Sequence, residues 1–150
     1  MAKKKITWEY SAGGVVFKKE KGKILWLIIQ PEGTKRWQLP KGKIEKGDKA
    51  EQTALREVKE EGGVEAKIFS DLGKITYFYS WEKERIGKQV RFFLMEYTRG
   101  SPKDHDHEVE KAKFFEFDEA LKRLTFENAK EVLKKGRKAL EETERHPSLL

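Results

Sequence analysis

Apolar runs separated by turn-forming residues divide the first part of the chain into candidate strands. The runs at 10–18 and 24–30 are rich in Val, Ile, Phe and Trp, and the charged turn between them contains Gly22. β-Branched and aromatic residues are enriched in strands, and a short glycine-containing turn between two such runs is typical of a hairpin. We therefore predict a β-hairpin from these two runs.

Further strand signals follow later in the chain. Two longer strands are expected at 66–80, with an interruption at Gly73, and at 89–97. The charged segment 82–88 is expected to form the turn that joins them, and a shorter strand is expected near 112–117.

Two segments instead show the three- and four-residue spacing of apolar positions that indicates a helix. The first runs from about 49 to 61 and follows Asp48, which is a favourable N-cap residue with Glu51 three positions later. The second covers 126–144, and a short helical piece precedes it near residue 119. The apolar stripe of the second helix consists of Val132, Leu133 and Leu140.

Strands that alternate irregularly with a few helices predict an α+β fold, in which one mixed β-sheet packs between helices. The length of 150 residues suits a single domain, and neither an internal repeat nor a linker divides the sequence. We therefore predict one domain over residues 1–150.

Composition narrows the cellular setting and the class of partner. The chain has no cysteine, which excludes disulfides and fits a reducing compartment, so a cytoplasmic location is expected. No apolar run approaches the roughly 18 residues that a membrane span needs, so no membrane partner is expected. The formal net charge of +7 favours polyanionic partners, whether nucleic acid, inositol phosphates or a small nucleoside polyphosphate, and the sign of the charge alone does not choose among them.

The first predicted helix carries a dense acidic cluster. Glu57, Glu60 and Glu61 stand at positions i, i+3 and i+4, which place three carboxylates on neighbouring positions of one helical face. Such like charges repel unless a cation binds them, and Mg²⁺ (or Mn²⁺) prefers oxygen ligands of this kind. The alternative is an ordinary solvated face, partly balanced by Arg56 and Lys59.

The surroundings of this cluster favour the metal site. Segment 42–64 reads GKIEKGDKAEQTALREVKEEGGV and resembles the Nudix box. Asp48 stands where the family has glutamate, which is the one departure at a fixed position. A pattern that fixes so many residue types is far more specific than a lone glycine motif. The matching residues are Gly42, Arg56, Glu57, Val58, Glu60, Glu61, Gly63 and Val64.

The resemblance implies the Nudix fold, an α/β/α sandwich with a loop–helix–loop catalytic motif. It implies that Glu57, Glu60 and Glu61 are metal ligands and that Glu57 helps to deprotonate the attacking water. Arg56 is expected to hold the glutamates in place. The main-chain carbonyl near Lys41 or Gly42 is expected to complete the coordination of the metal. Because aspartate is one methylene shorter than glutamate, the contact of position 48 with Arg56 or with a metal-bound water is expected to be lost or moved.

Many family members have a further glutamate on a loop before the last strand. Glu108 stands at that position, and by the resemblance it is expected to be an additional ligand or base. Glu110 is its competitor, and both have the alternative of being solvated loop residues. His105 and His107 lie in the same loop and are more simply explained as exposed side chains.

Segments outside the box narrow the substrate. SAGGVVF, WQLPKGKIEKGD, TALREVKEEGGV and ITYFY together resemble bacterial and archaeal diadenosine tetraphosphate hydrolases. This resemblance implies asymmetric cleavage of diadenosine tetraphosphate into ATP and AMP, as a monomer or a homodimer.

Several side chains around the box suit such a substrate. Lys41 and Lys43 precede the acidic helix and are candidates for phosphate contacts, with Arg36 as a third. Tyr77 and Tyr79 alternate along one strand, so both are expected on the same face, where they could stack on adenine. Without a role in binding, the cations would serve only to keep the surface soluble, and the tyrosines would serve only to pack the sheet.

Rival functions remain within and outside the enzyme class. The lysine-rich entrance also suits inositol pyrophosphates or the triphosphate end of RNA, because the box specifies chemistry and not the leaving group. A non-catalytic module that binds nucleotides or RNA is favoured only by Asp48, whereas the intact Arg56 and its three glutamates argue against it.

Overall fold

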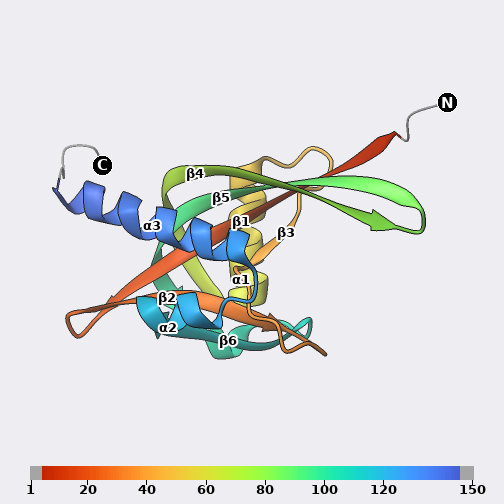
Figure 1. Cartoon of the computed structure of the whole chain (residues 1–150). Helices are drawn as coiled ribbons and strands as arrows, with labels where there is room; N and C mark the ends of the chain where they lie inside the picture. Colours follow the sequence, from red (N-terminus) through yellow and green to blue (C-terminus); the bar gives the residue numbers. More distant parts are fainter. Residues whose placement is uncertain (1–4, 146–150) are drawn as a thin grey trace.

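The computed structural model describes residues 5–145, which form one mixed sheet with helices on both faces (Figure 1). The strands are β1 (Ile6–Glu20), β2 (Lys23–Pro31), β3 (Lys41–Lys43), β4 (Val64–Trp81), β5 (Glu84–Gly100) and β6 (Val109–Glu116). The helices are α1 (Ala50–Gly62), α2 (Phe117–Arg123) and α3 (Glu127–Arg145), with a short 3₁₀ turn at Pro102–Asp104. The predicted α+β sandwich is therefore confirmed.

The sheet combines antiparallel and parallel pairs. Its strand order is β4-β5-β1-β2-β6, and β3 pairs with β1 beside this path. β1 and β2 form the predicted antiparallel hairpin, whereas β1 and β5 run parallel over twelve paired positions, from Ile6↔Arg85 to Phe17↔Glu96. Because β3 occupies the β1 edge at Ser11–Gly13, it brings the loop before α1 against the centre of the sheet.

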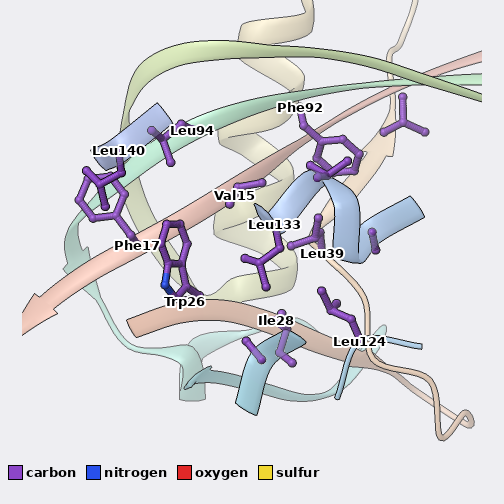
Figure 2. Close-up of a cluster of buried hydrophobic side chains, with 14 residues drawn as sticks. Val15, Phe17, Trp26, Ile28, Leu39, Phe92, Leu94, Leu124, Leu133 and Leu140 are labelled. Carbon is purple, nitrogen blue, oxygen red and sulfur yellow. The ribbon is translucent and has the colours of Figure 1, made fainter. Parts of the chain in front are cut away.

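Two apolar cores lie on opposite faces of this sheet. On the α3 face, Val15, Phe17 and Trp26 pack against the helix, and Figure 2 shows these side chains converging with others around Leu133. On the α1 face, Val16 and Val58 belong to the second core. Strand alternation explains the division, because adjacent residues of β1 point to opposite faces. The predicted stripe of α3, Val132, Leu133 and Leu140, is buried.

The predicted turn at 82–88 is mostly wrong. β4 ends at Trp81, and β5 begins at Glu84 and continues through 84–88, so only Glu82 and Lys83, which have positive φ angles, form the turn. The charged side chains of 84–88 misled the prediction because this part of the hairpin projects from the body, where both faces of a strand can be polar. Within residues 5–145, no helix is both long and apolar enough to cross a membrane.

Candidate functional site

Glu57 and Glu61 lie where α1 packs against β3. The Lys41 backbone N–H donates to Glu61 Oε1 at 2.8 Å. Gly42 lies so close to Glu57 that a Cβ atom on this glycine would overlap the Glu57 carboxylate. The main chain of β3 and the two carboxylates predicted from the sequence are therefore neighbours in the structure.

Both carboxylates lie in a poorly hydrated, negatively charged environment. Burial raises the pKa of Glu61 to about 8, and the neighbouring Glu57 adds to this shift, whereas the Lys41 N–H opposes it. Burial also raises the pKa of Glu57, with Glu60 as the next cause. Burial and the neighbouring carboxylates penalise the charged form of both side chains, so a cation bound between them would be stabilised there.

The donor set fits a hard divalent cation. Carboxylate oxygens and a nearby main chain are the ligands that Mg²⁺ accepts, and a bound cation would offset the burial that raises the pKa of Glu57 and of Glu61. Within the described part of the chain, no three acidic or histidine side chains converge into a preformed metal site. The ligand roles of Glu57, Glu60 and Glu61 therefore stay predictions.

Asp48 keeps a contact with Arg56 despite its short side chain. Arg56 Nη1 donates to Asp48 Oδ2 at 2.9 Å, and this bond is the first cause of a raised pKa for Arg56. The expected loss of this contact is therefore wrong. The predicted N-cap role of Asp48 is also wrong, because α1 begins after Lys49, whose N–H donates to the Gln52 side chain at 3.0 Å. Asp48 is thus free to orient Arg56.

The loop before β6 is tied to the end of α1. The Asp106 N–H donates to the Glu60 carbonyl at 2.7 Å, and the Asp106 carboxylate accepts the Glu108 N–H at 3.0 Å. Asp106 and Glu108 both contribute to the raised pKa of Glu57, and Asp106 also acts on Glu61. Sequence reasoning chose Glu108 and missed Asp106.

The other candidates in this loop lie apart from the carboxylates. Glu110 is exposed on β6, and His107 is exposed. The Nδ1 atom of His105 lies 2.8 Å from the Asp106 carbonyl oxygen, so this histidine interacts with the loop backbone. The role of Glu108 as an additional ligand or base stays a prediction, with Asp106 as a new candidate.

A cationic group adjoins the carboxylates on the other side. Burial lowers the pKa of Lys41 to about 8, and Lys88 and Arg36 lower it further by repulsion, whereas Glu61 opposes the shift. Lys88, on β5, was missed because the sequence placed it in a turn. Lys41 and the two cations beside it, Lys88 and Arg36, form a positively charged group that favours an anion. Lys43, one strand position beyond Gly42, is exposed.

A pocket of about 230 Å³ opens beside Lys41. Three aromatic side chains, Tyr77, Phe92 and Phe126, contribute to its walls. Tyr79 does not line it, and its hydroxyl hydrogen-bonds to Glu9 instead. Trp37 packs edge to face against Phe115 at 5.5 Å between ring centroids and adjoins the core on the α3 face. The remaining lining residues are Gln38, Leu39, Ile75, Asn128 and Ala129.

Comparisons with known proteins agree with this geometry. The family model of the NUDIX domain matches residues 8–135. The chain is 34% identical over 127 residues to the asymmetrical bis(5'-nucleosyl)-tetraphosphatase of Sus scrofa, a match that covers 78% of this chain and 81% of that protein. It is 37% identical over 124 residues to MutT4 of Mycobacterium tuberculosis, and it spans about half the length of that relative: the match covers 79% of this chain and 50% of that protein.

Solved structures show the same fold. A Caenorhabditis elegans Ap4A hydrolase, in a binary complex, superposes with a TM-score of 0.70 at 24% sequence identity. The match covers 89% of this chain and 98% of that one. The arrangement of one mixed sheet between helices is therefore shared with that structure over nearly its whole length.

Proposed function

Because this chain belongs to the Nudix family and is a pyrophosphohydrolase, we propose that it cleaves diadenosine tetraphosphate asymmetrically into ATP and AMP. The resemblance of the segments around the box and the similarity to the Sus scrofa tetraphosphatase support this substrate. The continuity of the aromatic pocket with Lys41, and of Lys41 with Glu61, is the observation that carries the proposal. The aromatic pocket could hold an adenine base, Lys41 could bind the phosphates, and the carboxylates beside Lys41 could hold the group that is cleaved.

The carboxylates serve the divalent cation and the attacking water. Glu57, Glu60 and Glu61 would hold the divalent cation, Mg²⁺ or Mn²⁺, that Nudix hydrolases generally need. When bound, this cation activates water and neutralises charge at phosphorus. Glu57 accepts the proton of the attacking water, with Glu108 or Asp106 as the nearby carboxylate that adds to its basicity. Arg56, oriented by Asp48, holds the glutamates from the helix surface.

The substrate is positioned from the opposite side. Tyr77 stacks on one adenine in the aromatic pocket, while Lys41, Lys88 and Arg36 bind the phosphate chain that leads to Glu61. Water attacks one phosphorus, the P–O bond of the anhydride breaks, and the displaced oxygen leaves on the other nucleotide. The exposed Lys43 contacts the chain farther out, and Tyr79 has at most an outer role because Glu9 binds its hydroxyl.

A substrate panel tests this proposal. Diadenosine polyphosphates, triphosphorylated RNA, inositol pyrophosphates and nucleoside triphosphates are each incubated with Mg²⁺, with Mn²⁺ and with chelator, and the products are separated. We expect metal-dependent release of ATP and AMP from diadenosine tetraphosphate, faster than turnover of any other compound. Preference for another compound would overturn the substrate and keep the chemistry.

Two variants test the assigned carboxylates. Glu57→Gln and Glu61→Gln are each expected to lower kcat by on the order of 10²-fold or more while the fold survives, because each removes one charge of the cation-binding group. Glu51→Gln is the matched control, since it lies on the same helix but in the first turn and exposed. Undiminished turnover by both variants would refute the mechanism. The cytoplasmic location and the monomer or homodimer state stay predictions.

A further inference from the structure

A three-stranded arm projects from the body of the molecule. It consists of residues 6–10 of β1, 76–81 of β4 and 84–89 of β5, and Figure 1 shows it extending beyond the helices. β5 is the middle strand, parallel to β1 and antiparallel to β4. One face of the arm carries Tyr77 and Lys88, which belong to the proposed substrate site, whereas the opposite face has no part in that site.

One face of the arm is aromatic. Register places Trp8, Gly87 and Phe78 side by side, so they share a face with Ile6 and Tyr10, which flank Trp8 on alternate positions. Trp8 is 39% exposed, Phe78 47% and Tyr10 50%, although large aromatic side chains are usually well buried. These residues are called the aromatic face below.

The Trp8 ring is held in place by its neighbours on the arm. The Trp8 ring lies over Gly87, where an added Cβ would approach three of its ring carbons to between 2.8 and 3.0 Å. Phe78 meets Trp8 edge to face at 5.7 Å between centroids. Because Gly87 supports one side of the indole, its other side faces outward as a rigid platform for a planar group.

Cations accompany the rings on this face. The Arg85 guanidinium lies 5.2 Å from the Phe78 ring centroid, and Lys74 and Arg91 stand at the base of the arm. Arg91 is paired with Asp71 and also lies near Glu51, so the three cations exceed the two nearby carboxylates by one. At the paired strand positions of the described arm, the carboxylates Glu9 and Glu84 belong to the opposite face.

The base of the aromatic face is hollowed. An open hollow of about 250 Å³ lies where β1, β4 and β5 meet the loop before α1, and its lining includes Tyr10, Lys74 and Arg91. A cationic hollow next to a row of aromatic rings is complementary to a polymer in which each unit carries one phosphate and one planar base.

We propose that the aromatic face binds single-stranded nucleic acid, with bases stacked on Trp8 and Tyr10 and phosphates bound by Lys74 and Arg85. Aromatic platforms combined with cations are the common solution for single strands, because each base has a π-face and each linkage a negative charge. A second copy of this chain fits less well, since two such faces would bring their cationic excess together. This surface is separate from the proposed catalytic reaction and goes beyond it.

The test uses a fluorescein-labelled 12-nucleotide RNA with a 5′-hydroxyl end, titrated in chelator at several salt concentrations and followed by anisotropy. The 5′-hydroxyl and the chelator remove the contributions of a terminal phosphate and of a bound metal at the pyrophosphohydrolase site. The double variant Lys74→Gln, Arg85→Gln is expected to weaken binding by about fivefold or more at low salt and to reduce the log–log salt slope by roughly 1.4, the value for two lost contacts to a single strand.

Matched controls separate this surface from net charge and from hydrophobicity. Lys135→Gln, Lys138→Gln removes the same charge from the exposed side of α3 and is expected to leave affinity within twofold. Trp8→Leu is expected to weaken binding, whereas Trp81→Leu, on the opposite face, is not. Circular dichroism checks that each variant folds.

Two results would overturn the proposal. The first is no saturable binding by the wild-type chain, or equal losses in the arm and α3 variants. The second is a molar mass by light scattering that falls in the arm variants while RNA affinity does not change, which would assign the aromatic face to self-association.

Discussion

Gly42 determines how closely β3 approaches the Glu57 carboxylate. In Gly42→Ala, the new methyl group would occupy the place of the Glu57 carboxyl group. Because the overlapping atoms are the far end of a flexible side chain, we expect the carboxylate to move and the fold to persist. The expected outcome is a fall in kcat of roughly 10- to 100-fold with a change in Tm of only a few degrees. Steady-state kinetics and calorimetry measure both.

The control for this prediction is the double variant Gly42→Ala, Glu57→Gln. If the alanine acts by displacing Glu57, the second substitution adds little further loss, because the carboxylate is already out of place. Multiplicative losses from the two changes would show instead that Gly42 acts through another contact.

Asp48 provides a second residue-level prediction. Since it orients Arg56 and does not cap α1, Asp48→Asn is expected to lower kcat by roughly tenfold while helix content is unchanged. Asp48→Glu is expected to keep most of the wild-type activity, because the carboxylate is retained. Because asparagine caps a helix about as well as aspartate does, Asp48→Ala tests the capping role, and loss of helical circular dichroism in that variant would contradict the assignment.

Spacing along the chain predicted the part of the site that lies on one helix, and the resemblance to the Nudix family added Glu108 from a distant loop. Glu57 and Glu61 share one helix, so spacing alone placed them together. Asp106 and Lys88 reach the same site through pairing between distant segments, the β6 loop with α1 and β5 with β4. No local pattern marks such residues, because their neighbours are determined by the topology of the whole sheet.

At the scale of elements, helices and hairpins were predicted well and the ends of strands were not. The β1–β2 hairpin and α1 have strong local signals, namely apolar runs, glycine turns and helical spacing. β3 escaped prediction because three residues, Lys41–Lys43, have no apolar alternation and pair only because β1 lies beside them. Phe117 was assigned to the last strand but begins α2.

The turn of the β4–β5 hairpin is strained. Glu82 and Lys83 have φ angles of 49° and 66°, a region that costs a non-glycine residue about 1 kcal/mol or more. Asn-Gly is the favoured pair for such a turn, so Glu82→Asn with Lys83→Gly is expected to raise the free energy of unfolding by roughly 0.5–1 kcal/mol. Urea titration measures this gain. Lys83→Ala is the control and is expected to give no gain, since alanine keeps the strain.

At the scale of the molecule, one sheet couples the two cores. Val15 and Phe17 belong to the α3-side core, and Val16, which lies between them on β1, belongs to the α1-side core. Neither core can be disrupted without loss of the strand that both use. We therefore expect residues 5–145 to unfold as one cooperative unit, as is usual for domains of this size.

This coupling can be tested by a substitution in the α1-side core whose effect on unfolding is measured with a probe in the α3-side core. Val58→Ala is expected to cost roughly 2 kcal/mol, because it leaves a cavity in the α1-side core. The resonance of Trp26, labelled with 5-fluorotryptophan, reports on the α3-side core, where this residue is 1% exposed. Its urea midpoint should fall by the same amount as the midpoint from far-ultraviolet circular dichroism. A Trp26 midpoint that stays at the wild-type value, while the circular dichroism splits into two steps, would show that the sheet does not transmit stability between its faces.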